Sequence, residues 1–207
     1  MTTNVLTSAE WNGGASPYAV GQKKLGMWLF LVSDSLTFGA LLISCMYART
    51  ADGNWPAPFP MWPSVAFAGF MTFCLLTSSL TMAFAVAASR RGDRPAAVKF
   101  ILLTMLGGAA FIVLHAREWL LLIREGVRPW SNPWGSPLFG ASFFGLTGLH
   151  MFHVFSGLIY LGIMTLGIRN GRRTHEDVEV CGLYWHFVDL VWMFIFPLIY
   201  LMSVSPK

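Results

Sequence analysis

Five stretches of this 207-residue chain are apolar over about the thickness of a lipid bilayer. A transmembrane helix needs roughly 20 consecutive, mainly apolar residues. The five expected spans cover residues 25–47, 61–88, 98–123, 138–168 and 183–204. Charged residues make up only 12% of the chain, about half of their share in a soluble domain. The sequence therefore predicts an integral membrane protein.

An all-α fold is expected, because an isolated strand leaves its backbone groups without partners in lipid. We expect a polytopic bundle of five transmembrane helices over residues 25–207, preceded by a polar N-terminal segment over residues 1–24. The span 138–168 is rich in glycine, alanine and serine. Small residues let membrane helices approach closely, so we expect this span at the centre of the bundle.

Basic residues are distributed unequally between the two ends of the predicted helices. One end has nine: Lys23, Lys24, Arg90, Arg91, Arg94, Lys99, Arg169, Arg172 and Arg173. The other end has four: Arg49, Arg124, Arg128 and Lys207. Because positively charged loops stay in the cytoplasm, we expect a cytoplasmic N-terminus and an outer C-terminus. This asymmetry explains the net charge of +4, so nucleic-acid binding is not indicated.

Catalytic, cofactor-binding and metal-binding motifs are not found in the sequence. Cys45, Cys74 and Cys181 lack the spacing of a disulfide framework or a zinc site. There is no phosphate-binding loop, no dinucleotide fingerprint and no Cys-x-x-Cys-His sequence. We therefore expect no cofactor in this chain.

Ionisable side chains interrupt four of the five predicted spans. These residues are Asp34, His115, Arg117, Glu118, His150, His153, His186 and Asp189. A charged side chain at the centre of a membrane helix costs roughly 2.5–3.5 kcal/mol on insertion scales, so such residues face protein or water. The sequence therefore predicts a polar network inside the bundle.

Several of these residues have more than one possible role. Three roles are open for Asp34. Its carboxyl group can be held by the hydroxyls of Ser33, Ser35 or Thr37, it can be protonated because it is desolvated, or it can be coupled to a proton or lipid pathway. Arg117 can reach lipid headgroups at the membrane surface.

Adjacent residues do not face one another on a helix, so Arg117 and Glu118 are expected to find partners on other helices. His150 with His153, and His186 with Asp189, each share a helix face. These four can build a metal site, although a hydrogen-bonded packing role is the stronger interpretation. His175 is expected in the loop Asn170–Cys181, which leaves too few membrane histidines for both a haem and a copper centre.

Two segments resemble subunit III of the haem–copper oxidases. They are Phe144–Gly157, FGLTGLHMFHVFSG, and Tyr184–Trp192, YWHFVDLVW. The segment Trp28–Asp34 is similar to the Trp-Leu-Phe…Ser-Glu segment of that family, and Glu118-Trp119 is similar to a further acidic site. Together these matches extend from about Leu25 to Tyr200.

The resemblance implies a non-catalytic accessory subunit of a bacterial haem–copper oxidase, a proton-translocating complex of the respiratory chain in the cytoplasmic membrane. Its partners would be the catalytic subunit I, subunit II and membrane phospholipids, with haem and copper in the partner subunits. The implied role is to stabilise the catalytic subunit, its proton uptake and bound lipid. The implied polar network or subunit interface is Asp34, Glu118, His150, His153, Trp185, His186 and Asp189. Arg117 and Trp119 are the candidates for lipid contact.

Two features depart from the family pattern. Asp34 is one methylene shorter than the glutamate usual at that position, and five spans replace the seven of the mitochondrial type. The missing pair forms one wall of the lipid cleft, so either another subunit supplies that wall or the lipid site is altered. The alternatives are an accessory subunit of a nitric oxide reductase, an independent small transporter and an enzyme with its own metal. The electron donor, quinol or cytochrome c, stays open.

Overall fold

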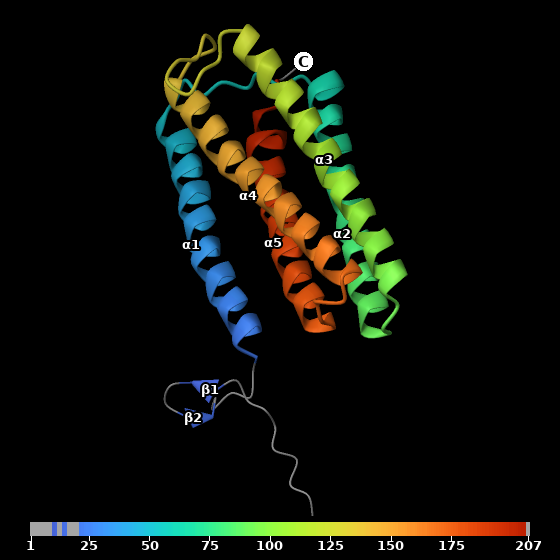
Figure 1. The fold of residues 1–207 in the computed structure, drawn as a ribbon. Coiled ribbons are helices and arrows are strands. Elements are labelled where there is room, and N and C mark those ends of the chain that lie inside the picture. Colours follow the sequence, from blue (N-terminus) through green and yellow to red (C-terminus); the bar gives the residue numbers. More distant parts are fainter. Residues whose placement is uncertain (1–9, 12–13, 16–20, 206–207) are drawn as a thin grey trace, which may run out of the picture.

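The computed structural model describes residues 10–11, 14–15 and 21–205 and confirms a five-helix architecture (Figure 1). The long helices are α1 (Gln22–Ala51), α2 (Ala66–Arg90), α3 (Arg94–Arg124), α4 (Pro137–Arg169) and α5 (His175–Ile199). The short elements are β1 (Glu10–Trp11) paired with β2 (Gly14–Ala15), η1 (Met61–Val65) before α2, and η2 (Leu201–Ser203) after α5. Within the described residues, five helical segments are long and apolar enough to cross a membrane. Most of the predicted polar segment 1–24, and Lys207, lie outside the described residues.

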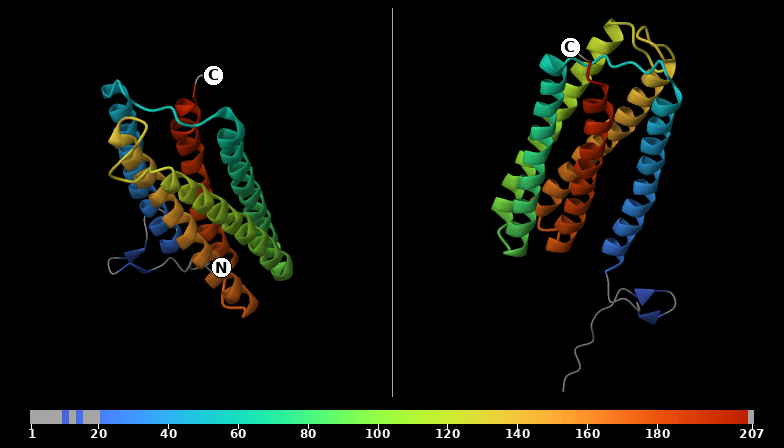
Figure 2. Two further views of the ribbon diagram at one scale, coloured as in Figure 1. Left: turned by 90° about the horizontal axis from the view of Figure 1, so that it is seen from above. Right: turned by 180° about the vertical axis from the view of Figure 1, so that it is seen from behind.

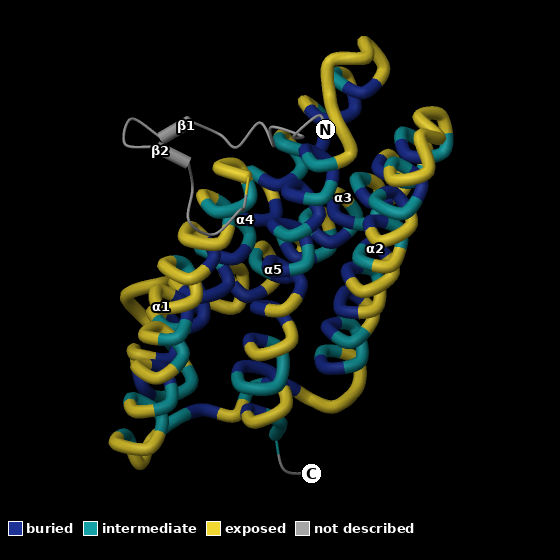
Figure 3. The backbone as a smooth tube through the Cα atoms, turned by 90° about the horizontal axis from the view of Figure 1, so that it is seen from below, coloured by how far each residue is buried: buried dark blue, intermediate teal, exposed yellow. Residues whose placement is uncertain are grey.

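The five helices form a central pair with helices on either side of it (Figures 1 and 2). The central helices α4 and α5 pack on each other, α1 packs on both of them, and α2 and α3 pack together on the opposite side. The most apolar window of α5 is 50% buried, whereas that of α1 is 17% buried. The burial-coloured tube shows the same difference between the middle of the bundle and its edge (Figure 3). The predicted central helix, α4, shares that position with the more buried α5.

Helix α5 begins at His175, well before the predicted start of the fifth span. Thr174 accepts a hydrogen bond from the backbone N–H of Asp177, and the carboxylate of Asp177 accepts one from the backbone N–H of Thr174. This capping box stabilises a helix start in a charged segment where hydropathy gives no signal. The prediction of a loop over Asn170–Cys181 was therefore wrong from His175 onward, because α5 begins at that residue.

Two glycines leave space for the indole of Trp185 at the centre of the bundle. A Cβ atom at Gly108 of α3 would lie 2.5 Å from the Trp185 ring, and one at Gly157 of α4 would lie 3.0 Å from it. The indole N–H of Trp185 donates to Ser78 Oγ of α2 at 3.1 Å. One fully buried side chain of α5 thus contacts three neighbouring helices.

The two ends of the bundle differ in chemistry. The basic end comprises the start of α1 and the α2–α3 and α4–α5 turns. There, the ammonium of Lys23 lies 2.6 Å from the Asp177 carboxylate, and that of Lys24 lies 2.8 Å from Glu179. The proline-rich end comprises the α1–α2 and α3–α4 loops and the segment after α5. There, the backbone N–H of Phe59 donates to the Ser203 carbonyl at 3.2 Å.

Candidate functional site

Asp34 and His153 form a polar contact between α1 and α4. His153 Nε2 lies 3.2 Å from Asp34 Oδ2, which is an ion-pair distance without well-aligned hydrogen-bond geometry. His153 Nδ1 lies 2.8 Å from the Leu149 carbonyl oxygen and therefore carries the proton that it donates. A favourable contact at Nε2 then needs one further proton, either on the ring or on the carboxyl group. Asp34 and His153 therefore form a polar link between α1 and α4.

The hydroxyls beside Asp34 do not hold its carboxylate. Ser33, Ser35 and Thr37 each donate to a backbone carbonyl of their own helix, at 2.8, 2.7 and 3.3 Å. A hydroxyl inside a helix commonly bonds to the carbonyl three or four residues earlier, because that acceptor is always in reach. The interpretation of Asp34 as held by neighbouring hydroxyls was therefore wrong.

Glu118 on α3 is bonded by a residue that follows α5. The Tyr200 hydroxyl donates to Glu118 Oε2 at 2.6 Å, and His115 Nδ1 lies 3.2 Å from the same oxygen. His115 is fully buried and stacks on Phe111, with ring centroids 5.6 Å apart. Glu118 thus has its hydrogen-bond donor outside its own helix. Tyr200 was not among the predicted site residues, although a tyrosine at the end of an apolar span needs a partner for its hydroxyl.

His150 lies apart from His153 despite their spacing. Its ring stacks on Trp192 of α5 at 5.1 Å between centroids and meets Phe111 of α3 edge-on at 5.6 Å. Neither ring nitrogen has a hydrogen-bond partner among the described residues. His150 therefore faces α3 and α5, whereas His153 faces α1.

His186 and Asp189 both face α2. The Ser79 hydroxyl lies 2.6 Å from His186 Nδ1, and Ser79 is also next to Asp189. The Asp189 residue is only 4% exposed, and neither carboxylate oxygen has a well-aligned hydrogen bond within the described part of the chain. The predicted polar residues are thus divided among separate interhelical contacts. Over the described ranges, no three His, Cys, Asp or Glu side chains are grouped to hold a metal.

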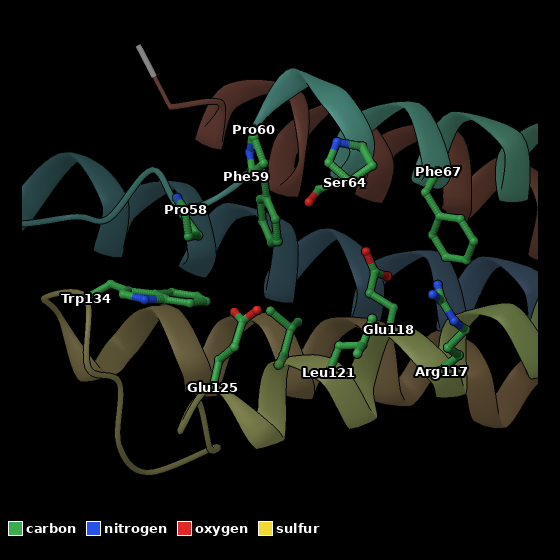
Figure 4. A pocket seen from close by; sticks show the side chains of 12 residues that line it. Pro58, Phe59, Pro60, Ser64, Phe67, Arg117, Glu118, Leu121, Glu125 and Trp134 are labelled. Atoms are coloured by element: carbon green, nitrogen blue, oxygen red, sulfur yellow. The ribbon is translucent and has the colours of Figure 1, made fainter. Parts of the chain in front are cut away.

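A pocket of about 510 Å³ opens between α2 and α3 at the proline-rich end (Figure 4). The carboxylates of Glu118 and Glu125 and the Trp134 ring line it. The guanidinium of Arg117 lies over the Phe67 ring, 5.2 Å from its centroid. Arg117 is exposed at this end of the bundle. Its contact with a lipid headgroup stays a prediction.

Trp119 contacts α4, whereas Arg117 contacts α2. Its indole N–H donates to Thr147 Oγ1 of α4 at 3.2 Å, and its ring packs edge-on against Phe144 at 5.0 Å. The two residues proposed together for lipid contact therefore point to different surroundings.

An apolar ridge of α5 remains uncovered in the middle of the bundle. Leu190, Met193 and Phe194 are exposed although the opposite side of the same helix is buried. A groove of about 270 Å³ separates this ridge from α1, and one of about 420 Å³ lies between α2 and α5. His186 lines the second groove. Leu190, Met193 and Phe194, with the groove between them and α1, are called the α5 ridge below.

Comparison with known proteins identifies the family. The chain is 34% identical over 186 residues to the quinol oxidase subunit 3 of Bacillus spizizenii, covering 87% of each chain. It is 33% identical over 189 residues to the cytochrome c oxidase subunit 3 of Bacillus sp. strain PS3, covering 88% of this chain and 86% of the relative. It is 31% identical over 183 residues to the cytochrome bo(3) ubiquinol oxidase subunit 3 of Pseudomonas putida, covering 87% and 86%. Residues 2–204 match the family described as cytochrome c oxidase subunit III. The resemblance is confirmed, and this chain is a member of the cytochrome c oxidase subunit III family.

Proposed function

We propose that this chain is the non-catalytic accessory subunit of a bacterial haem–copper oxidase and that it packs against catalytic subunit I through the α5 ridge. Membership of the family implies a complex with other oxidase subunits. Haem and copper belong to the partner subunits in this proposal. The basic end faces the cytoplasm, because it has most of the lysines and arginines.

The α5 ridge is the observation that supports this proposal. Apolar exposure alone does not identify an interface in a membrane, since lipid tails are also apolar. Leu190 is three residues from Met193 and four from Phe194, and the groove beside α1 is lined by Leu190 and Phe194. Ridges that fit into grooves are how helices pack. A helix of subunit I can therefore cover this surface.

His186 adds a polar reason for a protein partner. Its ring lines the groove between α2 and α5, and Ser79 occupies only its Nδ1 atom. A lipid tail offers no partner for the remaining ring nitrogen, and an unsatisfied polar group in hydrocarbon is unfavourable. A side chain of the catalytic subunit would satisfy it.

The Asp34–His153 pair supports a role in proton uptake. It places a carboxyl group 3.2 Å from an imidazole, and the Asp34 side chain is 13% exposed at the edge of the bundle. A group that holds a proton close to the catalytic subunit can assist that subunit's proton supply. We propose that loss of this pair shortens the working life of the oxidase without removing its haem.

The direct experiment is to purify the native complex through a tag on this chain. We expect catalytic subunit I and subunit II to co-purify and the visible spectrum to show their haems. The haem types and the bound donor distinguish a quinol oxidase from a cytochrome c oxidase. A solitary polypeptide, a chromophore in this chain alone, or co-purification with a nitric oxide reductase would contradict the proposal.

A further inference from the structure

A second pocket lies at the basic end, between the α2–α3 turn and the α4–α5 turn. Its volume is about 430 Å³. Its basic lining residues are Arg90, Arg94, Arg172, Arg173 and His175. We call this space the arginine pocket. Among the described residues, no aspartate or glutamate lines it. Four guanidinium groups from both turns thus surround one concave space.

Most of this charge is unpaired within the chain. Arg90 lies 3.1 Å from the Glu179 carboxylate. The guanidinium groups of Arg94, Arg172 and Arg173 have no hydrogen bond or ion pair with any residue in the part that the structure describes. Like charges that converge in a pocket repel one another, so the arrangement favours a bound anion.

Two glycines shape the arginine pocket. A Cβ atom at Gly167 would lie 2.5 Å from Cγ of Arg173, so the arginine side chain lies directly on the α4 backbone. A Cβ atom at Gly171 would lie 3.4 Å from Nη1 of Arg94, so Arg94 of α3 extends to the α4–α5 turn. Membrane topology explains an excess of arginine in these turns. It does not explain why glycine makes room for Arg173.

We propose that the arginine pocket binds the phosphate group of a phosphate ester at the membrane surface. Guanidinium groups bind phosphate oxygens through paired N–H donors, and several of them can surround one phosphate. Basic pockets between transmembrane helices on the cytoplasmic side are typical sites for anionic lipid headgroups. The phosphate belongs to an anionic phospholipid or to a soluble phosphate compound. This site lies at the opposite end of the bundle from Arg117 and does not depend on which oxidase the chain serves.

Binding to the native complex tests the proposal directly. The complex is reconstituted in nanodiscs of phosphatidylcholine, and spin-labelled phosphatidylglycerol is titrated in at constant ionic strength. We expect the double variant Arg94→Gln/Arg173→Gln to weaken phosphatidylglycerol binding about tenfold or more, because charge-assisted hydrogen bonds are lost. Gly167→Ala keeps every charge but displaces Arg173, and we expect it to weaken binding severalfold.

Arg91→Gln is the matched control. Arg91 belongs to the same turn and has the same charge, but it does not line the pocket. We expect its effect to stay below about twofold, since only the diffuse surface potential changes. An unchanged haem spectrum and unfolding temperature verify that each variant complex is intact.

Competition with inorganic phosphate identifies the source of the phosphate. If phosphate does not displace the lipid label, the ligand is a lipid headgroup. If inorganic phosphate binds the wild type and the double variant loses that binding, the ligand is a soluble phosphate compound. Equal effects of Arg91→Gln and the double variant, or no effect of either pocket variant on phosphatidylglycerol and phosphate, would overturn the proposal.

Discussion

Helices α1 and α5 each place an aspartate among apolar residues, but the two carboxyl groups have different surroundings. Asp34 of α1 meets His153 across a helix boundary and belongs to the least buried of the five spans. Asp189 of α5 lies in the most buried span without a well-aligned hydrogen bond in the described chain. The two helices thus differ in depth of burial: α1 packs at the edge of the bundle, whereas α5 is deeply buried and is also hydrogen-bonded to its neighbours.

Replacing a central tryptophan should have the largest effect. Trp185→Ala removes a fully buried indole between Gly108 and Gly157 and should lower the free energy of unfolding by about 3 kcal/mol. Trp28→Ala is the matched change on α1, where the side chain is 49% exposed, and should have an effect below about 0.5 kcal/mol. Unfolding in mixed micelles, followed by circular dichroism, measures both. Equal effects would mean that α1 is packed as α5 is.

Asp34→Ala tests the polar attachment of α1. It leaves His153 without its carboxylate, and an unpaired buried polar group costs about 1–3 kcal/mol. We also expect unchanged haem content and fewer turnovers before activity decays. Ser33→Ala is the control, because that hydroxyl bonds only to its own helix. A double-mutant cycle with His153→Ala measures the coupling, and an unchanged turnover lifetime would contradict the proposed role.

A polar residue on the α5 ridge tests the interface. Leu190→Asn should reduce co-purification of catalytic subunit I about tenfold, which corresponds to about 1.4 kcal/mol. Ile159→Asn on the exposed side of α4 introduces the same group elsewhere on the membrane surface. We expect this control to keep the complex. If Ile159→Asn disrupts the complex and Leu190→Asn does not, the interface lies on α4.

The five helices were predictable from the sequence because hydropathy over a bilayer length is a local property. The start of α5 was predicted wrongly because its first turn is charged, although the Thr174-x-x-Asp177 pattern is a local signal for a helix start. The missed signal was thus one of capping rather than of hydropathy.

The partners of the polar residues depend on the helix arrangement and were not predictable from one sequence. Residues three apart, such as His150 and His153, differ by about 60° around a helix. Because α4 has neighbours on several sides, that angle is enough to direct them to different helices. Tyr200 meets Glu118 because the end of α5 lies close enough to α3 for the tyrosine hydroxyl to reach it.

The ion pairs at the basic end should have the smallest effect. The Lys23 side chain is 61% exposed, whereas its partner Asp177 is buried and stays bonded to Thr174 when Lys23 is replaced. The exposed ammonium limits the contribution of this pair to about 0–1 kcal/mol. Lys23→Gln should therefore lower the free energy of unfolding by about 0.5 kcal/mol or less, and the difference should shrink as salt is added. Arg91→Gln, at an exposed arginine without an ion pair in the described part of the chain, is the control. If Lys23→Gln has as large an effect as Asp34→Ala, then α1 is anchored at its basic end as firmly as at its middle.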